Sequence, residues 1–125
     1  EIKATLQAAR IVWPERRIIV VFQPHRYTRT LALFDEFTRA FYESDSLVVL
    51  PIYSAGEKQT QGADAKILSE NITAHGHREV VFKEDFAAAV AYLKTILKPG
   101  DVLLTLGAGD VWKLGEEILK LKIEK

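Results

Sequence analysis

Ile18-Ile19-Val20-Val21-Phe22 runs directly into Gln23-Pro24-His25-Arg26-Tyr27-Thr28-Arg29-Thr30, and this junction sets the pattern for the whole chain. A short apolar run rich in β-branched residues indicates a buried strand. The periodic apolar residues that follow indicate a helix over about residues 31–43. The polar loop between them favours anion binding, because it lies at the carboxyl end of a strand and at the positive end of a helix.

The composition is that of an ordinary globular domain. Of the 125 residues, 48% are hydrophobic and 27% are charged, which suffices for one domain with a buried core. Lysine plus arginine (17) balances aspartate plus glutamate (17), so no bulk charge favours nucleic acid or an anionic membrane. Cysteine is absent, which excludes disulfides and thiolate metal sites. The chain begins with Glu1 and has no methionine, so we expect a piece of a longer protein.

Apolar runs alternate with amphipathic segments along the chain. The predicted strands span about residues 18–22, 46–50, 79–82 and 102–106, and the predicted helices span about residues 2–12, 31–43, 63–74, 86–97 and 111–121. Strands that alternate with helices imply a parallel sheet covered on both faces. We therefore predict a doubly wound, Rossmann-like α/β fold with a mostly parallel sheet.

Three loops should meet at the carboxyl edge of that sheet, where ligands of such folds bind. They are residues 23–30, 51–57 and 106–110. In the first loop, Arg26 and Arg29 each offer a planar guanidinium that can hold a carboxylate or a phosphate with two hydrogen bonds. The alternative is a pair of exposed arginines worth about 0–1 kcal/mol each in ion pairs. Because few acidic residues lie nearby in the sequence, we favour the anion site.

Two other features favour structural roles. Phe34, Phe37 and Phe41 recur at helical spacing and predict an apolar stripe on the 31–43 helix. The segment 75–77, His-Gly-His, follows the 63–74 helix, and two histidines one residue apart can ligate a metal. No carboxylate or thiolate motif accompanies them, so we expect both histidines to face solvent at the helix end, where they complement the helix dipole.

The last loop does not carry a nucleotide-binding fingerprint. Gly107-Ala108-Gly109 begins like a dinucleotide motif, but Trp112 stands where the third glycine is required. No phosphate-binding G-x-x-x-x-G-K-[ST] motif occurs in the chain, and neither a serine nucleophile motif nor a pair of catalytic carboxylates is present. We expect a tight turn whose backbone amides face the same edge as the other loops.

The first two loops resemble the C-terminal domain of the Mur ligases. The resemblance rests on residues 21–30, with the string His-Arg-Tyr-Thr-Arg, and on Tyr53-Ser54-Ala55-Gly56-Glu57 with Gly62-Ala63-Asp64 behind it. Gly107-Ala108-Gly109-Asp110 also matches. Within the family, the string is similar to that of the members that add L-alanine, and the resemblance covers essentially the whole chain.

The resemblance implies that residues 1–125 are the C-terminal domain of a three-domain, cytoplasmic, bacterial enzyme of peptidoglycan synthesis. In the family, ATP phosphorylates the carboxyl group of UDP-N-acetylmuramate, and the amine of L-alanine attacks the resulting acyl phosphate. A central ATPase domain would bind ATP and Mg²⁺, and this chain would pack against it. The isolated chain would hold no metal or cofactor of its own, would contact neither nucleic acid nor membrane, and would be inactive.

The resemblance also implies a set of site residues from the three loops. Arg26 and Arg29 would hold the alanine carboxylate and the phosphate being transferred, in an order that stays open, and His25 would position them. The second loop would border the amino-acid pocket, and the third would close it with backbone amides. The full set is His25, Arg26, Arg29, Tyr53, Ser54, Ala55, Gly107, Ala108 and Gly109. These roles contribute proximity and electrostatics, without a nucleophile or a base.

Two alternatives to a ligase domain stay open. The chain would be a stand-alone α/β module that binds a small phosphorylated or carboxylated metabolite through the same arginines, or an interaction domain with no small ligand. The encoding gene separates the ligase domain from the stand-alone module. An upstream phosphate-binding-loop domain supports the ligase, and a start codon next to Glu1 supports the module.

Calorimetry on this chain alone should show no measurable binding of L-alanine or ATP. Two charge-assisted contacts of about 1.5–3 kcal/mol each must offset an association cost of at least about 4 kcal/mol. L-alanine should then bind at millimolar strength or weaker, which corresponds to about −4 kcal/mol. A micromolar isotherm for either ligand would contradict the interpretation as a domain of a larger ligase.

Overall fold

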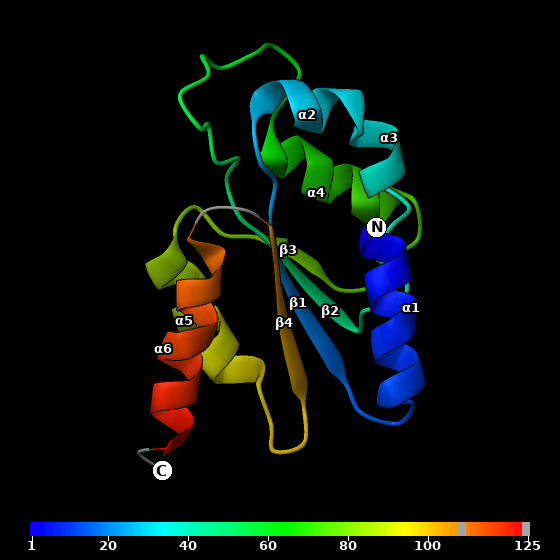
Figure 1. Cartoon of the computed structure of the whole chain (residues 1–125), viewed down its shortest axis with the longest axis vertical. Coiled ribbons are helices and arrows are strands. Elements are labelled where there is room, and N and C mark those ends of the chain that lie inside the picture. The colour runs from blue at the N-terminus through cyan, green and yellow to red at the C-terminus, as the bar shows by residue number, and fades with distance from the viewer. Residues whose placement is uncertain (108–109, 124–125) are drawn as a thin grey trace.

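Four parallel strands form a single sheet in the order β3-β2-β1-β4 in the computed structural model, which describes residues 1–107 and 110–123 (Figure 1). The strands are β1 (Ile18–Gln23), β2 (Ser46–Val49), β3 (Val80–Phe82) and β4 (Val102–Gly107). Strand β1 pairs on both sides, and Val20 lies between Leu47 of β2 and Leu104 of β4. The prediction of a parallel sheet is confirmed.

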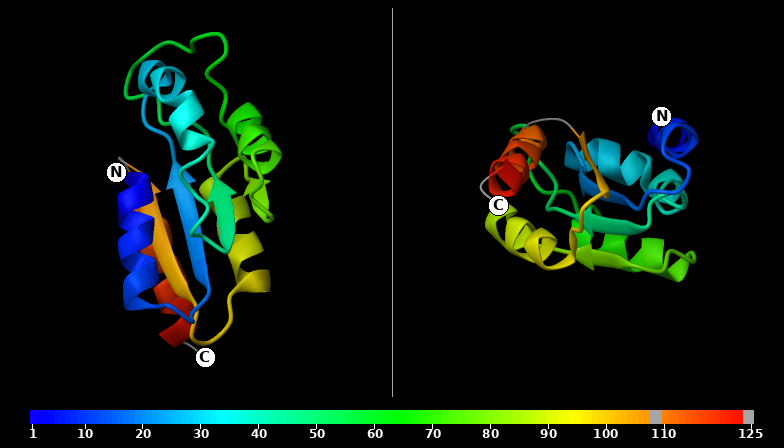
Figure 2. Two further views of the ribbon diagram at one scale, coloured as in Figure 1. Left: turned by 90° about the vertical axis from the view of Figure 1, so that its right-hand side faces the viewer. Right: turned by 90° about the horizontal axis from the view of Figure 1, so that it is seen from below.

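Helices cover both faces of the sheet (Figures 1 and 2). Helices α1 (Ile2–Val12) and α4 (Ala65–Ala74) pack with one set of alternate strand residues, and α5 (Phe86–Ile96) and α6 (Val111–Ile123) pack with the other. In β1, Val20 belongs to the first core and Val21 to the second, and both are fully buried. The doubly wound α/β prediction is therefore confirmed, because a strand buried on two faces needs helices on both.

The predicted helix over residues 31–43 is wrong. The chain instead forms two short helices, α2 (Tyr27–Ala32) and α3 (Phe34–Phe37), so that α2 begins inside the predicted loop. Thr38 ends α3 with its hydroxyl donating to the carbonyl of Asp35 at 2.6 Å, a local bond that competes with continued helix. The apolar stripe does form: the ring of Phe22 lies 5.2 Å from that of Phe37 and 5.0 Å from that of Phe41.

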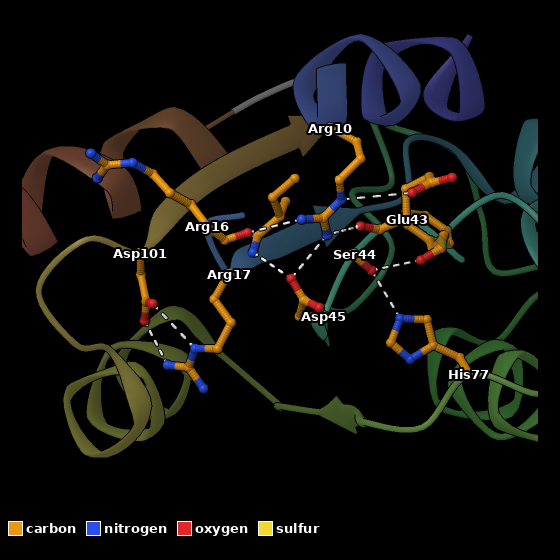
Figure 3. A network of polar contacts seen from close by, with 10 residues as sticks. Arg10, Arg16, Arg17, Glu43, Ser44, Asp45, His77 and Asp101 are labelled. Atoms are coloured by element: carbon orange, nitrogen blue, oxygen red, sulfur yellow. Dashed lines mark hydrogen bonds and ion pairs between the residues drawn. The ribbon is translucent and has the colours of Figure 1, made fainter. Parts of the chain in front are cut away.

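A network of polar side chains joins segments at the amino edge of the sheet (Figure 3). Arg10 of α1 donates to the carbonyls of Arg16 and Glu43, at 2.9 and 2.7 Å, and to the Asp45 carboxylate at 3.0 Å. Asp45 also accepts from the backbone amide of Ile18 at 2.7 Å, where β1 begins. The network thus holds α1 and the starts of β1 and β2 in one arrangement.

His77 lies inside this edge, and the expectation that it faces solvent is wrong. The side chain is only 6% exposed, while His75 is half-buried. The Nδ1 atom of His77 accepts from the amide of Glu79 at 3.1 Å, so the neutral ring must carry its proton on Nε2, which lies 2.9 Å from the Ser44 hydroxyl. Gly76, with φ 108°, turns the chain back towards Ser44, a contact between distant segments that local sequence does not reveal.

The burial of His77 should make the stability of the chain depend on pH. Burial lowers the pKa of His77 below its ordinary value of 6.5. The unfolded state therefore binds a proton at a pH where the folded state does not, and the free energy of unfolding should fall as the pH drops below about 6.5. Urea unfolding between about pH 8 and pH 5 measures this slope.

The variant His77→Gln should flatten that slope, because it removes the buried titrating group. His75→Gln is the matched control and should keep the slope of the unaltered chain. An equal pH dependence in His77→Gln and in the unaltered chain would show that another group is responsible.

Candidate functional site

The described residues of the three predicted loops lie together at the carboxyl edge of the sheet (Figure 1). Gln23 at the end of β1 pairs in register with Gly107 at the end of β4. Beyond the strands, His25 and Tyr53 form an isolated parallel bridge. The predicted meeting of these loops is confirmed for the described residues, whereas Ala108 and Gly109 lie outside them.

The first and second loops are joined by backbone and ring contacts. The amide of Arg26 donates to the carbonyl of Tyr53 at 2.7 Å, and the amide of Tyr53 donates to the carbonyl of Pro24 at 2.8 Å. The rings of His25 and Tyr53 stack with their centroids 5.5 Å apart and their planes at 12°. The two loops therefore form one unit, in which the position of the arginines depends on the chain around Tyr53.

Arg26 has a left-handed backbone conformation with φ 68° and ψ 140°. A residue with a side chain rarely adopts positive φ, and such residues gather at functional sites where surrounding bonds impose the conformation. At Arg26, hydrogen bonds hold both the amide and the carbonyl of the residue. The Arg26 amide is held by Tyr53, and its carbonyl accepts from the amide and the hydroxyl of Thr30, at 3.1 and 2.7 Å.

An acidic residue that the local sequence did not place near the arginines caps the start of α2. The carboxylate of Glu57 accepts from the amide of Thr28 at 3.1 Å and from its hydroxyl at 2.6 Å. The hydrogen bonds from Thr28, and the nearby positive charge of Arg26, lower the pKa of Glu57. Glu57 is therefore an acid that is remote from the arginines in the sequence but lies against Thr28, between them, in the structure.

A pocket of about 640 Å³ opens beside the ends of β1 and β4, next to the start of α1 and to α3. Of the predicted site residues, it contains His25, Arg29 and Gly107. Apolar side chains contribute to its wall, and charged side chains of both signs lie around it. The full lining is Glu1, Ile2, Lys3, Phe22, Gln23, His25, Arg29, Leu33, Asp35, Glu36, Phe37, Arg39, Ala40, Leu106 and Gly107.

Four other predicted site residues do not line this pocket, namely Arg26, Tyr53, Ser54 and Ala55. Arg26 is exposed, Tyr53 is 43% exposed, and both lie on the unit formed by the first two loops. Ser54 and Ala55 continue the second loop and are half-buried. The structure thus places Arg29 at the pocket and Arg26 outside it, although the two are three residues apart.

Gln23 is a pocket residue that the sequence analysis did not select. It is 8% exposed, and its Nε2 atom donates to the carbonyl of Pro51 at 3.3 Å. Its Oε1 atom is buried without a hydrogen-bond partner among the described residues. The sequence does place Gln23 as the first polar residue after an apolar run. In a parallel sheet, residues at this position lie at the edge where ligands bind.

The donor set of the site suits an anion better than a metal ion. Arg26 and Arg29 supply planar guanidinium groups, which match carboxylate and phosphate oxygens. Within residues 1–107 and 110–123, no three histidine, cysteine, aspartate or glutamate side chains gather where they could hold a metal ion. Among the described residues, no helix is long and apolar enough to cross a membrane.

Residues 1–109 match the family model described as Mur ligase, glutamate ligase domain. The chain belongs to the Mur ligase family. Two curated relatives of this chain carry the name UDP-N-acetylmuramate--L-alanine ligase. The protein from Desulfosudis oleivorans is 64% identical over 95% of this chain, and that from Desulforapulum autotrophicum is 55% identical over 97%. The chain spans 26% of the length of each.

Solved structures of two ligases share the fold. A murein peptide ligase from Psychrobacter arcticus 273-4 superposes with a TM-score of 0.75 at 16% identity, covering 95% of this chain and 24% of that one. A domain from a putative UDP-N-acetylmuramate:L-alanyl-gamma-D-glutamyl-medo-diaminopimelate ligase of Haemophilus ducreyi 35000HP gives 0.66 at 19% identity, covering 96% of this chain and 80% of that one. At these identities the likeness concerns the fold alone.

The variant Gly107→Ala should disrupt the edge where the loops meet. Gly107 has φ 137°, and a Cβ added there would lie 2.4 Å from the carbonyl oxygen of Gln23. The backbone conformation alone should cost about 1–3 kcal/mol of unfolding free energy, measured by urea denaturation. Gly115→Ala is the matched control, because its Cβ would lie 3.5 Å from Thr105 in ordinary contact on a helix and should stabilise by about 0.5–1 kcal/mol. Equal stability of both variants would contradict the close approach of Gly107 to β1.

Proposed function

We propose that this chain is the C-terminal, amino-acid-presenting domain of an ATP-dependent ligase that joins L-alanine to UDP-N-acetylmuramate in bacterial peptidoglycan synthesis. The observation that carries the proposal is the placement of Arg29 and His25 in a pocket at the carboxyl edge, with Arg26 on the adjoining loop unit. The reaction has two anionic groups to hold near each other, the carboxylate of the amino acid and the phosphate being transferred. Two guanidinium groups three residues apart suit that need.

The pocket supports the amino-acid role. Arg29 and His25 line it beside Phe22 and Leu106, so a charged group and an apolar wall lie within one cavity. A small amino acid offers the matching features, a carboxylate and a short apolar side chain. Tyr53, Ser54 and Ala55 belong to the neighbouring unit and would border the amino-acid pocket from that side.

Proximity is the contribution that these residues would make to the reaction. Holding two reactants in a productive geometry turns a bimolecular step into an effectively unimolecular one, which lowers the barrier by up to about 7–11 kcal/mol. Arg26 and Arg29 would fix the anions, and the backbone at Gly107 would border the site. A guanidinium stays protonated at physiological pH and so cannot act as the base.

Phosphoryl transfer to the sugar carboxylate is the chemistry that ATP and Mg²⁺ supply in such a ligase. The arginines of this chain fit a phosphate group, whereas its described carboxylates and histidines do not cluster as metal ligands. We assign ATP and Mg²⁺ mainly to a central ATPase domain and UDP-N-acetylmuramate to an N-terminal domain of the same protein, as the family resemblance implies. This chain would pack against the central domain in the cytoplasm.

Replacing both arginines in the longest natural form of the protein should abolish most of its activity. Arg26→Ala with Arg29→Ala should reduce turnover by about 1,000-fold or more, because both anions lose their positioning groups. Phosphate release that requires both L-alanine and UDP-N-acetylmuramate measures the reaction.

Arg78→Ala is the matched control, since Arg78 is an exposed arginine outside the site, and its turnover should match that of the unaltered protein. Unchanged turnover in the double variant would favour an interaction or scaffold domain over an amino-acid-presenting domain.

A further inference from the structure

A tight turn in the second loop presents Glu57 to the first loop. Ala55 and Gly56 both have positive φ, 51° and 87°, and the amide of Glu57 donates to the carbonyl of Ser54 at 3.0 Å. Two consecutive residues at positive φ reverse the chain sharply. The chain thereby returns towards the start of α2, where the Glu57 carboxylate meets both donors of Thr28.

The position of Thr28 makes this contact important for the arginines. Thr28 lies two residues after Arg26 and one residue before Arg29, within the first turn of α2. Two hydrogen bonds from one residue to one carboxylate fix both the position and the orientation of the backbone between the arginines. We refer to the pair of bonds between Glu57 and Thr28 as the Glu57 clasp.

The clasp adds to the backbone bonds that hold this exposed part of the chain. Thr28, Arg26 and Arg29 are all exposed, so they gain little from packing in either hydrophobic core. Arg26 also keeps a left-handed conformation that relaxes unless its neighbours are fixed. Its own amide is bonded to Tyr53 in the second loop, and the clasp provides another link between the same loop and α2.

The clasp also occupies backbone and hydroxyl donors that a substrate anion could otherwise use. The amide of Thr28 already has an acceptor in Glu57, and the amide of Thr30 is bonded to the carbonyl of Arg26. The guanidinium groups of Arg26 and Arg29 are exposed and are open to a carboxylate or phosphate that reaches this loop. The lowered pKa of Glu57 agrees with a carboxylate that stays ionised in this place at neutral pH.

We propose that Glu57 is a positioning residue for the ligation reaction, which holds Arg26 and Arg29 in the geometry that receives the alanine carboxylate and the transferred phosphate. This inference rests on the proposed function. It adds a residue from the second loop whose contribution comes through Thr28 and not through contact with a substrate.

Variants of the longest natural form of the protein test the clasp. Glu57→Ala removes the carboxylate, and Thr28→Val removes the hydroxyl at nearly constant shape. Each should lower kcat/KM for L-alanine about 10- to 100-fold, the range expected when reacting groups are misplaced by about 1 Å. The conservative variants Glu57→Gln and Thr28→Ser keep an acceptor and a hydroxyl, respectively. Their kcat/KM for L-alanine should fall clearly less.

The control is Glu70→Ala, which removes an exposed carboxylate of α4 and should leave kcat/KM unchanged. Thermal unfolding of every variant separates positioning from stability. If Glu57→Ala lowers the unfolding midpoint but keeps the kcat/KM of folded protein, the clasp is only structural and the inference is wrong.

Two further results would also be decisive. An active unaltered protein whose Glu57→Ala and Thr28→Val variants are equally active would overturn the clasp as a positioning device and leave the proposed function intact. An unaltered protein that does not ligate L-alanine to UDP-N-acetylmuramate would overturn the proposed function and this inference together.

Discussion

The pairing of β1 with both β2 and β4 is the constraint on which the rest of the structure depends. Residues 18–22 are at most 3% exposed, and their alternate side chains enter two separate cores. A strand held by two ladders and two cores cannot shift by one residue without moving every side chain to the wrong face. The point at which β1 ends is therefore fixed, and the loop that carries Arg26 starts from a rigid position.

This constraint explains why the sheet could be predicted from the sequence. Apolar runs without alternation indicate strands buried on both faces, and the helices between them require parallel pairing. The course of residues 31–43 could not be predicted in the same way. Its apolar spacing is helical, but the actual breaks depend on the conformation of Leu33 and on the hydroxyl of Thr38, which periodicity does not register.

The position of the candidate site could be predicted from the order of strands and helices, whereas its side-chain contacts could not. Parallel strands bring their carboxyl ends to one edge, so the meeting of the loops around His25, Tyr53 and Gly107 followed from the order of the elements. The separation of Arg29 from Arg26 and the capping of α2 by Glu57 depend on contacts across the fold. Local sequence carries no signal for such contacts, and the burial of His77 against Ser44 was missed for the same reason.

The polar network at the amino edge has a consequence for how the domain tolerates change. Arg10 and Asp45 tie α1 to the starts of two strands, and Arg17 and Asp101 join β1 to β4 through a paired contact at 2.5 and 3.1 Å (Figure 3). These side-chain contacts hold the strand starts together at the end of the sheet opposite the loops. Exposed positions of the loops at the carboxyl edge, such as Arg26 and Tyr53, can therefore change while these contacts keep the strand starts in place.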